Sequence, residues 1–139
     1  MASELPTELP TELWVLGVAA ILLLVHVLAA GHYRTRQYGR DWNMGARDEN
    51  VPPLDPVPAR LLRAQANYQE TLPIAVIALL GVTVVGKTSD LTAIAASIWL
   101  AGRVIYLPLY GAGVPKVRTL VWGVATLAIL VVLGVLLVG

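Results

Sequence analysis

Four long apolar segments constrain this chain more than any other feature of its sequence. They cover residues 13–30, 72–85, 91–107 and 120–138. The chain is 57% hydrophobic and only 14% charged, whereas about a quarter of the residues in a soluble domain are charged. These proportions exclude both an ordinary water-soluble domain and a disordered chain. Because backbone groups in lipid must form their hydrogen bonds within the protein, we expect all four segments to be helical.

The apolar segments predict one all-α domain over residues 1–139, an integral membrane four-helix bundle. We expect its spans near residues 12–31, 60–85, 90–110 and 115–138. The second apolar segment has only 14 residues, too few to cross a hydrocarbon core of about 30 Å. The second helix must therefore include the polar residues that precede it, from Arg60 onward. The connection over residues 31–59 has two interpretations: a loop that lies on the lipid headgroups, or a lid over a ligand site.

The basic residues are distributed very unevenly between the two ends of the predicted bundle. Nine of the ten lie in or beside the first and third connections, and only Lys87 lies in the second. The positive-inside rule then predicts cytoplasmic first and third connections, with both termini outside. Residues 1–12 are acidic and contain no basic residue, which predicts a short solvated lead-in and not a secretory signal peptide.

Net charge and cysteine content narrow the possible partners. The net charge is +1 and cysteine is absent. The net charge says nothing about nucleic acid, and we expect no such partner. The absence of cysteine excludes a disulfide and a thiolate metal site, and we expect no metal. Any thiol chemistry would require a thiol that a ligand brings.

Three polar residues share one face of the second predicted helix. Arg63, Asn67 and Glu70 are spaced i, i+4 and i+7, and Gln65 lies off that line. Ionisable residues inside a membrane usually face the interior of a bundle or a wet cavity. This face is either a structural contact between helices or one wall of a polar pocket.

A matching polar face occurs on the third predicted helix. Arg103, Tyr106 and Tyr110 are spaced i, i+3 and i+7. Arg103 lies about two turns deeper than Tyr110, which favours pairing inside the bundle over snorkelling to the interface. We expect Glu70 to be its partner.

Two further polar features lie on the first and fourth predicted helices. The fourth helix begins with a proline, and its unpaired amides, Lys116 and Arg118 would attract an anion or an anionic lipid. His26 interrupts the first apolar segment. We expect it to be a satisfied buried residue of the bundle and not a catalytic one.

Three of the predicted helices thus bring a common set of polar groups to one side of the membrane. The set consists of Arg63, Asn67, Glu70, Arg103, Tyr106, Tyr110 and Arg118. It suits a small ligand with two carboxylates and one ammonium, since arginine binds carboxylates bidentately and Glu70 could accept the ammonium. An arginine beside a ligand thiol would also favour its thiolate form.

Residues 60–73 contain the pattern Arg-Ala-Gln-x-Asn-x-x-Glu followed by a proline. This pattern resembles the second-helix signature of the MAPEG family, the membrane-associated proteins in eicosanoid and glutathione metabolism. Residues 102–110 and 115–119 are also similar to the family, so the resemblance covers nearly the whole chain. It implies a homotrimer that binds glutathione between neighbouring subunits near the cytoplasmic side. The chain is most similar to bacterial members, which implies a bacterial inner or plasma membrane.

The resemblance also implies a role for individual residues. Arg118 lies where family enzymes hold the thiolate and is the expected catalytic residue. The expected glutathione-binding residues are Arg63, Gln65, Asn67, Glu70, Arg103, Tyr106, Tyr110 and Thr119. Arg34 or Arg36 corresponds to a first-helix arginine that contacts the peptide. Thr71 replaces a tyrosine of the leukotriene-forming branch, so the lipid substrate is left open.

Two functions remain open from the sequence. The first is a glutathione-dependent transferase or peroxidase that acts on a lipophilic electrophile in contact with membrane lipid. The second is a non-catalytic membrane bundle whose buried polar residues are structural. A small transporter is the weakest alternative, because the chain shows no inverted repeat.

Overall fold

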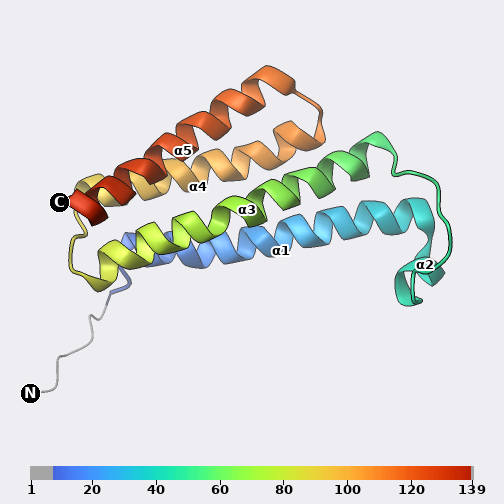
Figure 1. Ribbon diagram of the computed structural model, residues 1–139, viewed down its shortest axis with the longest axis horizontal. Coiled ribbons are helices and arrows are strands. Elements are labelled where there is room, and N and C mark those ends of the chain that lie inside the picture. The colour runs from blue at the N-terminus through green and yellow to red at the C-terminus, as the bar shows by residue number, and fades with distance from the viewer. Residues whose placement is uncertain (1–7, 139) are drawn as a thin grey trace, which may run out of the picture.

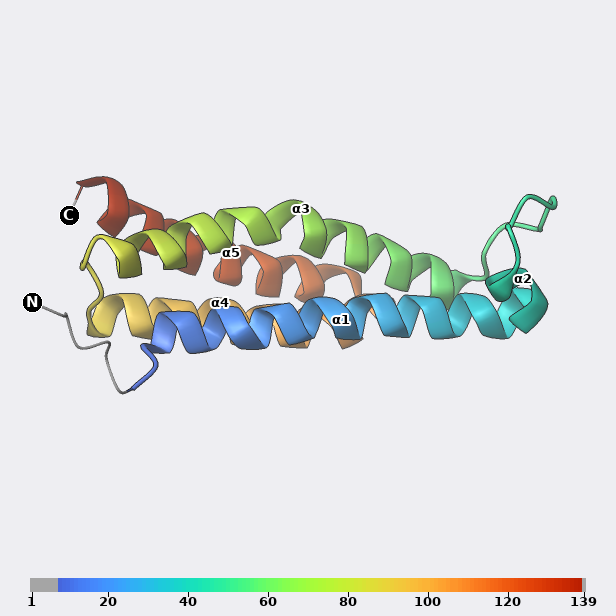
Figure 2. The ribbon, with the colours of Figure 1, turned by 90° about the horizontal axis from the view of Figure 1, so that it is seen from below.

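The computed structural model describes residues 8–138, which form five α-helices (Figure 1). They are α1 (Thr11–Tyr38), α2 (Arg40–Met44), α3 (Pro56–Val84), α4 (Asp90–Gly111) and α5 (Pro115–Val138). The all-α prediction is confirmed, since residues 8–138 contain no strand. The four long helices lie side by side, with α1 packed on α3 and α4 packed on α5 (Figures 1 and 2).

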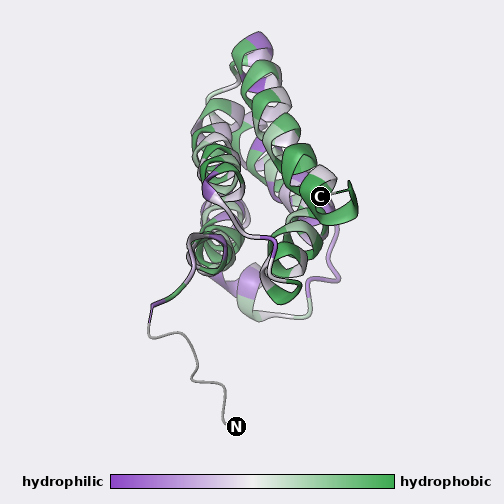
Figure 3. Cartoon of the chain, turned by 90° about the vertical axis from the view of Figure 1, so that its left-hand side faces the viewer, coloured by the Kyte–Doolittle hydropathy of each residue, from purple (hydrophilic) through white to green (hydrophobic). Residues whose placement is uncertain are grey.

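Three helices, α1, α4 and α5, are long and apolar enough to cross a membrane. Their outward faces carry large exposed apolar side chains such as Leu28, Ile94 and Leu127, and apolar residues predominate along the long helices (Figure 3). These faces match the surface that lipid requires. α3 is 29 residues long, but its N-terminal half is charged, so its membrane crossing stays a prediction.

The connection between the first two long helices differs from the loop expected over residues 31–59. α1 continues to Tyr38, and only Gly39, with a φ of 97°, ends it. The rest of the connection folds back onto α1, where the Tyr38 hydroxyl donates to Pro52 O (2.6 Å) and the Gln37 amide donates to Pro53 O (3.0 Å). The sequence becomes polar after residue 30, which marks the end of the apolar segment, but α1 itself continues for eight more residues.

The start of α1 also departs from the solvated lead-in expected over residues 1–12. Glu12 is only 2% exposed, and its carboxylate accepts a hydrogen bond from the Thr92 hydroxyl (2.7 Å). The same threonine forms a capping box with Ser89 at the first turn of α4. The prediction is thus wrong for Glu12, which fastens α1 to α4. Residues 1–7 lie outside the described part of the chain.

Small residues allow the helices to approach closely in the core. Ala19, Ala64, Ala96 and Ala125 are completely buried, as is typical of helix contacts within membranes. A Cβ atom at Gly102 of α4 would lie 2.8 Å from the Cβ of Ala125 on α5. No side chain fits there unless the two helices move apart.

We expect Gly102→Ala to destabilise the protein by about 1–3 kcal/mol, because the extra methyl group overpacks the contact between α4 and α5. The matched control is Gly123→Ala on α5, where an added Cβ meets nothing within 4 Å. Thermal unfolding in detergent should show a lower midpoint for Gly102→Ala alone. Equal midpoints for the two variants would contradict the close helix contact.

Candidate functional site

A pocket of about 280 Å³ lies between the first turns of α3 and the connection from α4 to α5. Its lining residues are Arg60, Arg63, Tyr110, Gly113, Pro115 and Arg118. Three of these six residues are arginines and none is acidic. Such a lining creates a positive potential that attracts an anionic ligand.

Local contacts hold the arginines of this pocket in place. Arg60 Nε donates to Gly111 O (3.0 Å), and Arg63 Nε donates to the Tyr110 hydroxyl (3.3 Å). The Arg118 guanidinium lies over the Tyr110 ring, 4.3 Å from its centroid. Gly113 has a φ of 77°, a conformation that a side chain disfavours and that closes the turn between α4 and α5.

A column of stacked polar groups runs from the pocket into the core. The rings of Tyr110 and Tyr106 meet edge to face, with centroids 5.5 Å apart. The Arg103 guanidinium lies 4.4 Å from the Tyr106 ring and 5.4 Å from the Tyr68 ring. The His26 ring stacks on the Tyr68 ring at the inner end of the column, with their centroids 4.8 Å apart. The column links α1, α3 and α4 to the pocket.

Arg103 is 2% exposed and does not pair with Glu70, so that prediction is wrong. Its Nη2 donates to Asn67 Oδ1 (2.9 Å), and its Nε and Nη1 have no partner among residues 8–138. Glu70, three residues further along α3, is exposed on the outer surface of the helix. The buried guanidinium therefore carries a positive charge that no carboxylate of the described chain balances.

The structure separates the expected site residues into three groups. Arg63, Tyr110 and Arg118 line the pocket, and Asn67, Arg103 and Tyr106 lie in the column beneath it. The remaining three do not line the pocket. Glu70 is exposed. Gln65 is half-buried, and its Oε1 has no partner within residues 8–138. Thr119 is exposed, and its hydroxyl donates to Pro115 O (3.2 Å).

Sequence reasoning missed two residues of this region. Arg60 lines the pocket, and its spacing of three from Arg63 on one helix was the available signal. Tyr68 is completely buried, and its hydroxyl donates to Ala19 O (2.5 Å). His26 is buried as expected, but neither ring nitrogen has a partner among the described residues.

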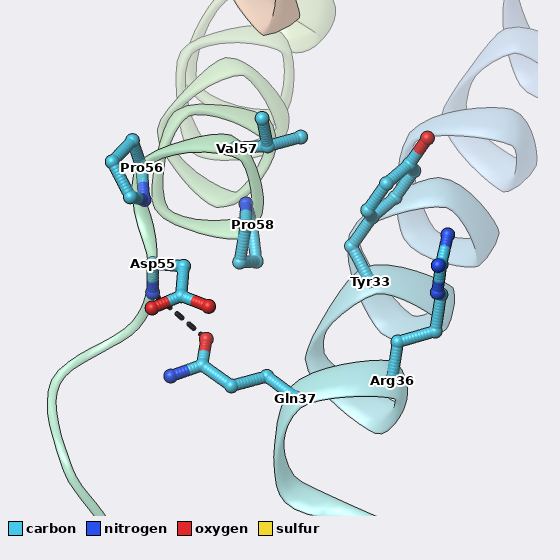
Figure 4. Close-up of a pocket in the computed structure, with 7 residues that line it drawn as sticks. All are labelled: Tyr33, Arg36, Gln37, Asp55, Pro56, Val57 and Pro58. Carbon is cyan, nitrogen blue, oxygen red and sulfur yellow. Dashed lines mark hydrogen bonds between the residues drawn. The ribbon is translucent and has the colours of Figure 1, made fainter.

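A second pocket, of about 480 Å³, lies between the end of α1 and the start of α3 (Figure 4). Arg36 lies 5.9 Å from the Tyr33 ring, and the Asp55 backbone amide donates to the Gln37 side chain (2.8 Å). Asp55 also lines this pocket, so one arginine is set against one carboxylate. The pocket is less suited to an anion than the one with three arginines.

No residue of the 31–59 segment lines the pocket with Arg118, so within one protomer the segment is not its lid. Neither Arg34 nor Arg36 reaches that pocket. Contact of either residue with a ligand held there would require a neighbouring subunit.

The family model described as MAPEG family matches residues 13–138 of the chain. This range includes all four long helices, apart from the first two residues of α1, and every residue of the arginine pocket. No curated protein and no solved structure matches the chain.

Proposed function

This chain belongs to the MAPEG family, and on that premise we propose that it is a membrane-bound glutathione-dependent transferase or peroxidase. The observation that carries the proposal is the arginine pocket, in which Arg60, Arg63 and Arg118 meet without an acidic residue. Charged groups at membrane depth are costly unless something balances them. An anionic ligand would supply that balance.

The spacing of polar groups along α3 supports a peptide ligand. Arg63 and Glu70 are seven residues apart, which is about 10 Å along a helix axis. An extended tripeptide spans about the same length. A carboxylate of glutathione at Arg63 would thus leave its ammonium close to Glu70, on the outer surface of α3. Asn67 lies between these two residues and could hydrogen-bond the peptide backbone.

Arg118 is the residue we propose to be catalytic. Its guanidinium lines the pocket and is held over the Tyr110 ring. A positive charge at this position would favour the thiolate of glutathione, which is the nucleophilic form. The sulfur would then bond to an electrophilic carbon of a lipophilic molecule from the membrane, and the leaving group would depart with the electron pair of the broken bond. With a lipid hydroperoxide, the sulfur would instead take the terminal oxygen as the O–O bond breaks and the alcohol leaves with a proton. A second glutathione would convert the resulting sulfenic acid to the disulfide and release water. Binding both reactants in one cleft contributes proximity.

A homotrimer is the assembly we propose. Arg63, Gln69 and Glu70 are exposed on α3 of the single protomer, although this helix runs between apolar neighbours. Polar side chains facing lipid are unfavourable, so a neighbouring subunit is a better cover than lipid. Glutathione would then lie between subunits, and either Arg34 or Arg36 of a neighbour could approach it.

We also propose an orientation in a bacterial inner or plasma membrane. The basic ends of α1, α3, α4 and α5 lie at one end of the molecule, away from the described ends of the chain (Figure 1). The positive-inside rule places this end in the cytoplasm and both termini outside. The pocket with Arg118 would then open to cytoplasmic glutathione.

The alternative is a non-catalytic bundle whose polar residues are structural. The hydrogen bond from Arg103 to Asn67 and the one from Tyr68 to Ala19 O favour it, because both connect helices inside one protomer. The two functions differ in whether glutathione binds at all.

Glu70→Gln is expected to remove the preference for a free ammonium. A charged hydrogen bond contributes about 1.5–3 kcal/mol, so wild-type protein should bind glutathione about 10–100 times more tightly than N-acetyl glutathione. The variant should bind both peptides equally in isothermal titration. Glu49→Gln, at an exposed acid in the first connection, should behave as wild type. A preserved preference in Glu70→Gln would remove Glu70 from the site.

A further inference from the structure

A third pocket, of about 590 Å³, lies between the last turns of α1 and α2. Its polar lining consists of His32, Arg34, Thr35, Asn43 and Arg47, and no acidic residue lines it. Gly31 and two apolar side chains, Val27 and Leu28, complete the lining on the side of the apolar segment of α1. The pocket shares no residue with the arginine pocket at Arg118.

Arg47 is held rigidly at this pocket. Its φ of 65° is the one positive value of a non-glycine residue in the described chain, and such backbone persists only where surrounding contacts fix it. Its Nη2 donates to Asn43 Oδ1 (2.6 Å), and its guanidinium lies 4.6 Å from the Trp42 ring. Among residues 8–138, the hydrogen bonds of Arg47 use its Nε and Nη2 and leave Nη1 for a ligand.

Asn43 connects this arginine to α1. Its amide donates to the Thr35 hydroxyl (2.9 Å), which in turn donates to Gly31 O (2.7 Å). These bonds hold α2 against the last turns of α1, and Arg47, in the segment that follows α2, is bonded to Asn43 of α2. Arg34 Nε is buried and has no partner among residues 8–138. Both arginines line the pocket, and no acidic residue in the lining balances their charge.

The pocket also crosses the boundary between apolar and polar surface. Val27 is 40% exposed and Leu28 is 69% exposed, and both belong to the apolar segment of α1 that ends at Ala30. The basic residues begin two residues later, at His32. A ligand that fills the whole pocket must therefore be anionic at one end and apolar at the other.

We propose that this pocket binds an anionic phospholipid, with its phosphate between Arg34 and Arg47 and an acyl chain over Val27 and Leu28. Arginine forms bidentate hydrogen bonds with phosphate. Free phosphate would leave the apolar side of the pocket uncovered. The proposal does not depend on which end of the protein faces the cytoplasm. It assigns Arg34 to the lipid and leaves Arg36, which does not line this pocket, as the first-helix arginine for glutathione.

The test is native mass spectrometry of the full-length protein mixed in detergent with phosphatidylglycerol or phosphatidylcholine. Wild-type protein should retain about one phosphatidylglycerol per protomer in preference to phosphatidylcholine. Each arginine near a membrane surface contributes about 1 kcal/mol, so the double variant Arg34→Gln, Arg47→Gln should bind phosphatidylglycerol about 30-fold more weakly. Arg40→Gln is the matched control, since this exposed arginine does not line the pocket.

Three outcomes would overturn the proposal. The first is equal retention of phosphatidylglycerol by the double variant and by wild type. The second is that inorganic phosphate displaces the lipid at equal concentration, which would show a simple anion site. The third is that Arg34→Gln loses glutathione binding or subunit association while lipid retention is unchanged, which would assign the pocket to a contact with a neighbouring subunit.

Discussion

Arg118→Ala is expected to lower the rate of glutathione conjugation about 100- to 1,000-fold, the usual effect of losing one group that stabilises developing negative charge. The physical reason is that the Arg118 guanidinium lines the pocket and is fixed over the Tyr110 ring. Without it, bound glutathione should remain a thiol at neutral pH. Thiolate absorbance in the ultraviolet, followed during a pH titration of protein saturated with glutathione, measures this directly.

The matched control for this variant is Lys116→Ala. Lys116 lies two residues earlier in the same first turn of α5, is exposed and does not line the pocket. It carries the same charge, so a general effect of positive potential would appear in both variants. A thiolate signal that persists in Arg118→Ala, or that disappears equally in Lys116→Ala, would remove Arg118 from the catalytic role.

Arg103→Met is expected to weaken glutathione binding about 10- to 100-fold without a large loss of stability. The guanidinium is buried, and two of its donor groups lack a partner within residues 8–138. A buried charge without a compensating partner is costly, so an apolar side chain of similar length removes that cost and offsets the loss of the hydrogen bond to Asn67. The variant also loses the positive charge of Arg103 beside Tyr106, so an anionic ligand should bind more weakly.

The non-catalytic alternative predicts the opposite pattern for Arg103→Met. If the bond from Arg103 to Asn67 serves only to join α3 to α4, the variant should melt at a lower temperature. Thermal unfolding and isothermal titration of the same preparation separate the two cases. Asn67→Leu is a useful companion variant, since it removes the acceptor of that bond and leaves the arginine.

Periodicity in the sequence was sufficient to predict three residues that line one pocket of the structure. The spacing of Arg63 on one helix and Tyr110 on another, with Arg118 at the start of a third, predicted residues that the structure brings around one pocket. The prediction works because the uneven distribution of basic residues places the helix ends that carry these three residues at the same end of the bundle. The helix period and the charge distribution together fix both the face and the level of a residue.

Two of the three errors originate in contacts between helices. Periodicity places Glu70 and Arg103 on polar faces, but it does not fix the rotation of α3 against α4, and Asn67 takes the position expected for Glu70. The burial of Glu12 depends on Thr92, 80 residues away. Hydropathy likewise locates where α1 leaves the membrane but not where it ends, because nothing before Gly39 stops the helix.

The most direct test of the central claim, that the arginine pocket binds glutathione, is thermal unfolding of the purified wild-type protein in detergent with increasing glutathione. The peptide in which alanine replaces cysteine should be titrated in parallel, because it keeps both carboxylates and the ammonium. We predict a saturable rise in melting temperature with both peptides, equivalent to about 2.7 kcal/mol at a concentration 100 times the Kd. No rise with either peptide at millimolar concentration would contradict the account and leave only a membrane bundle.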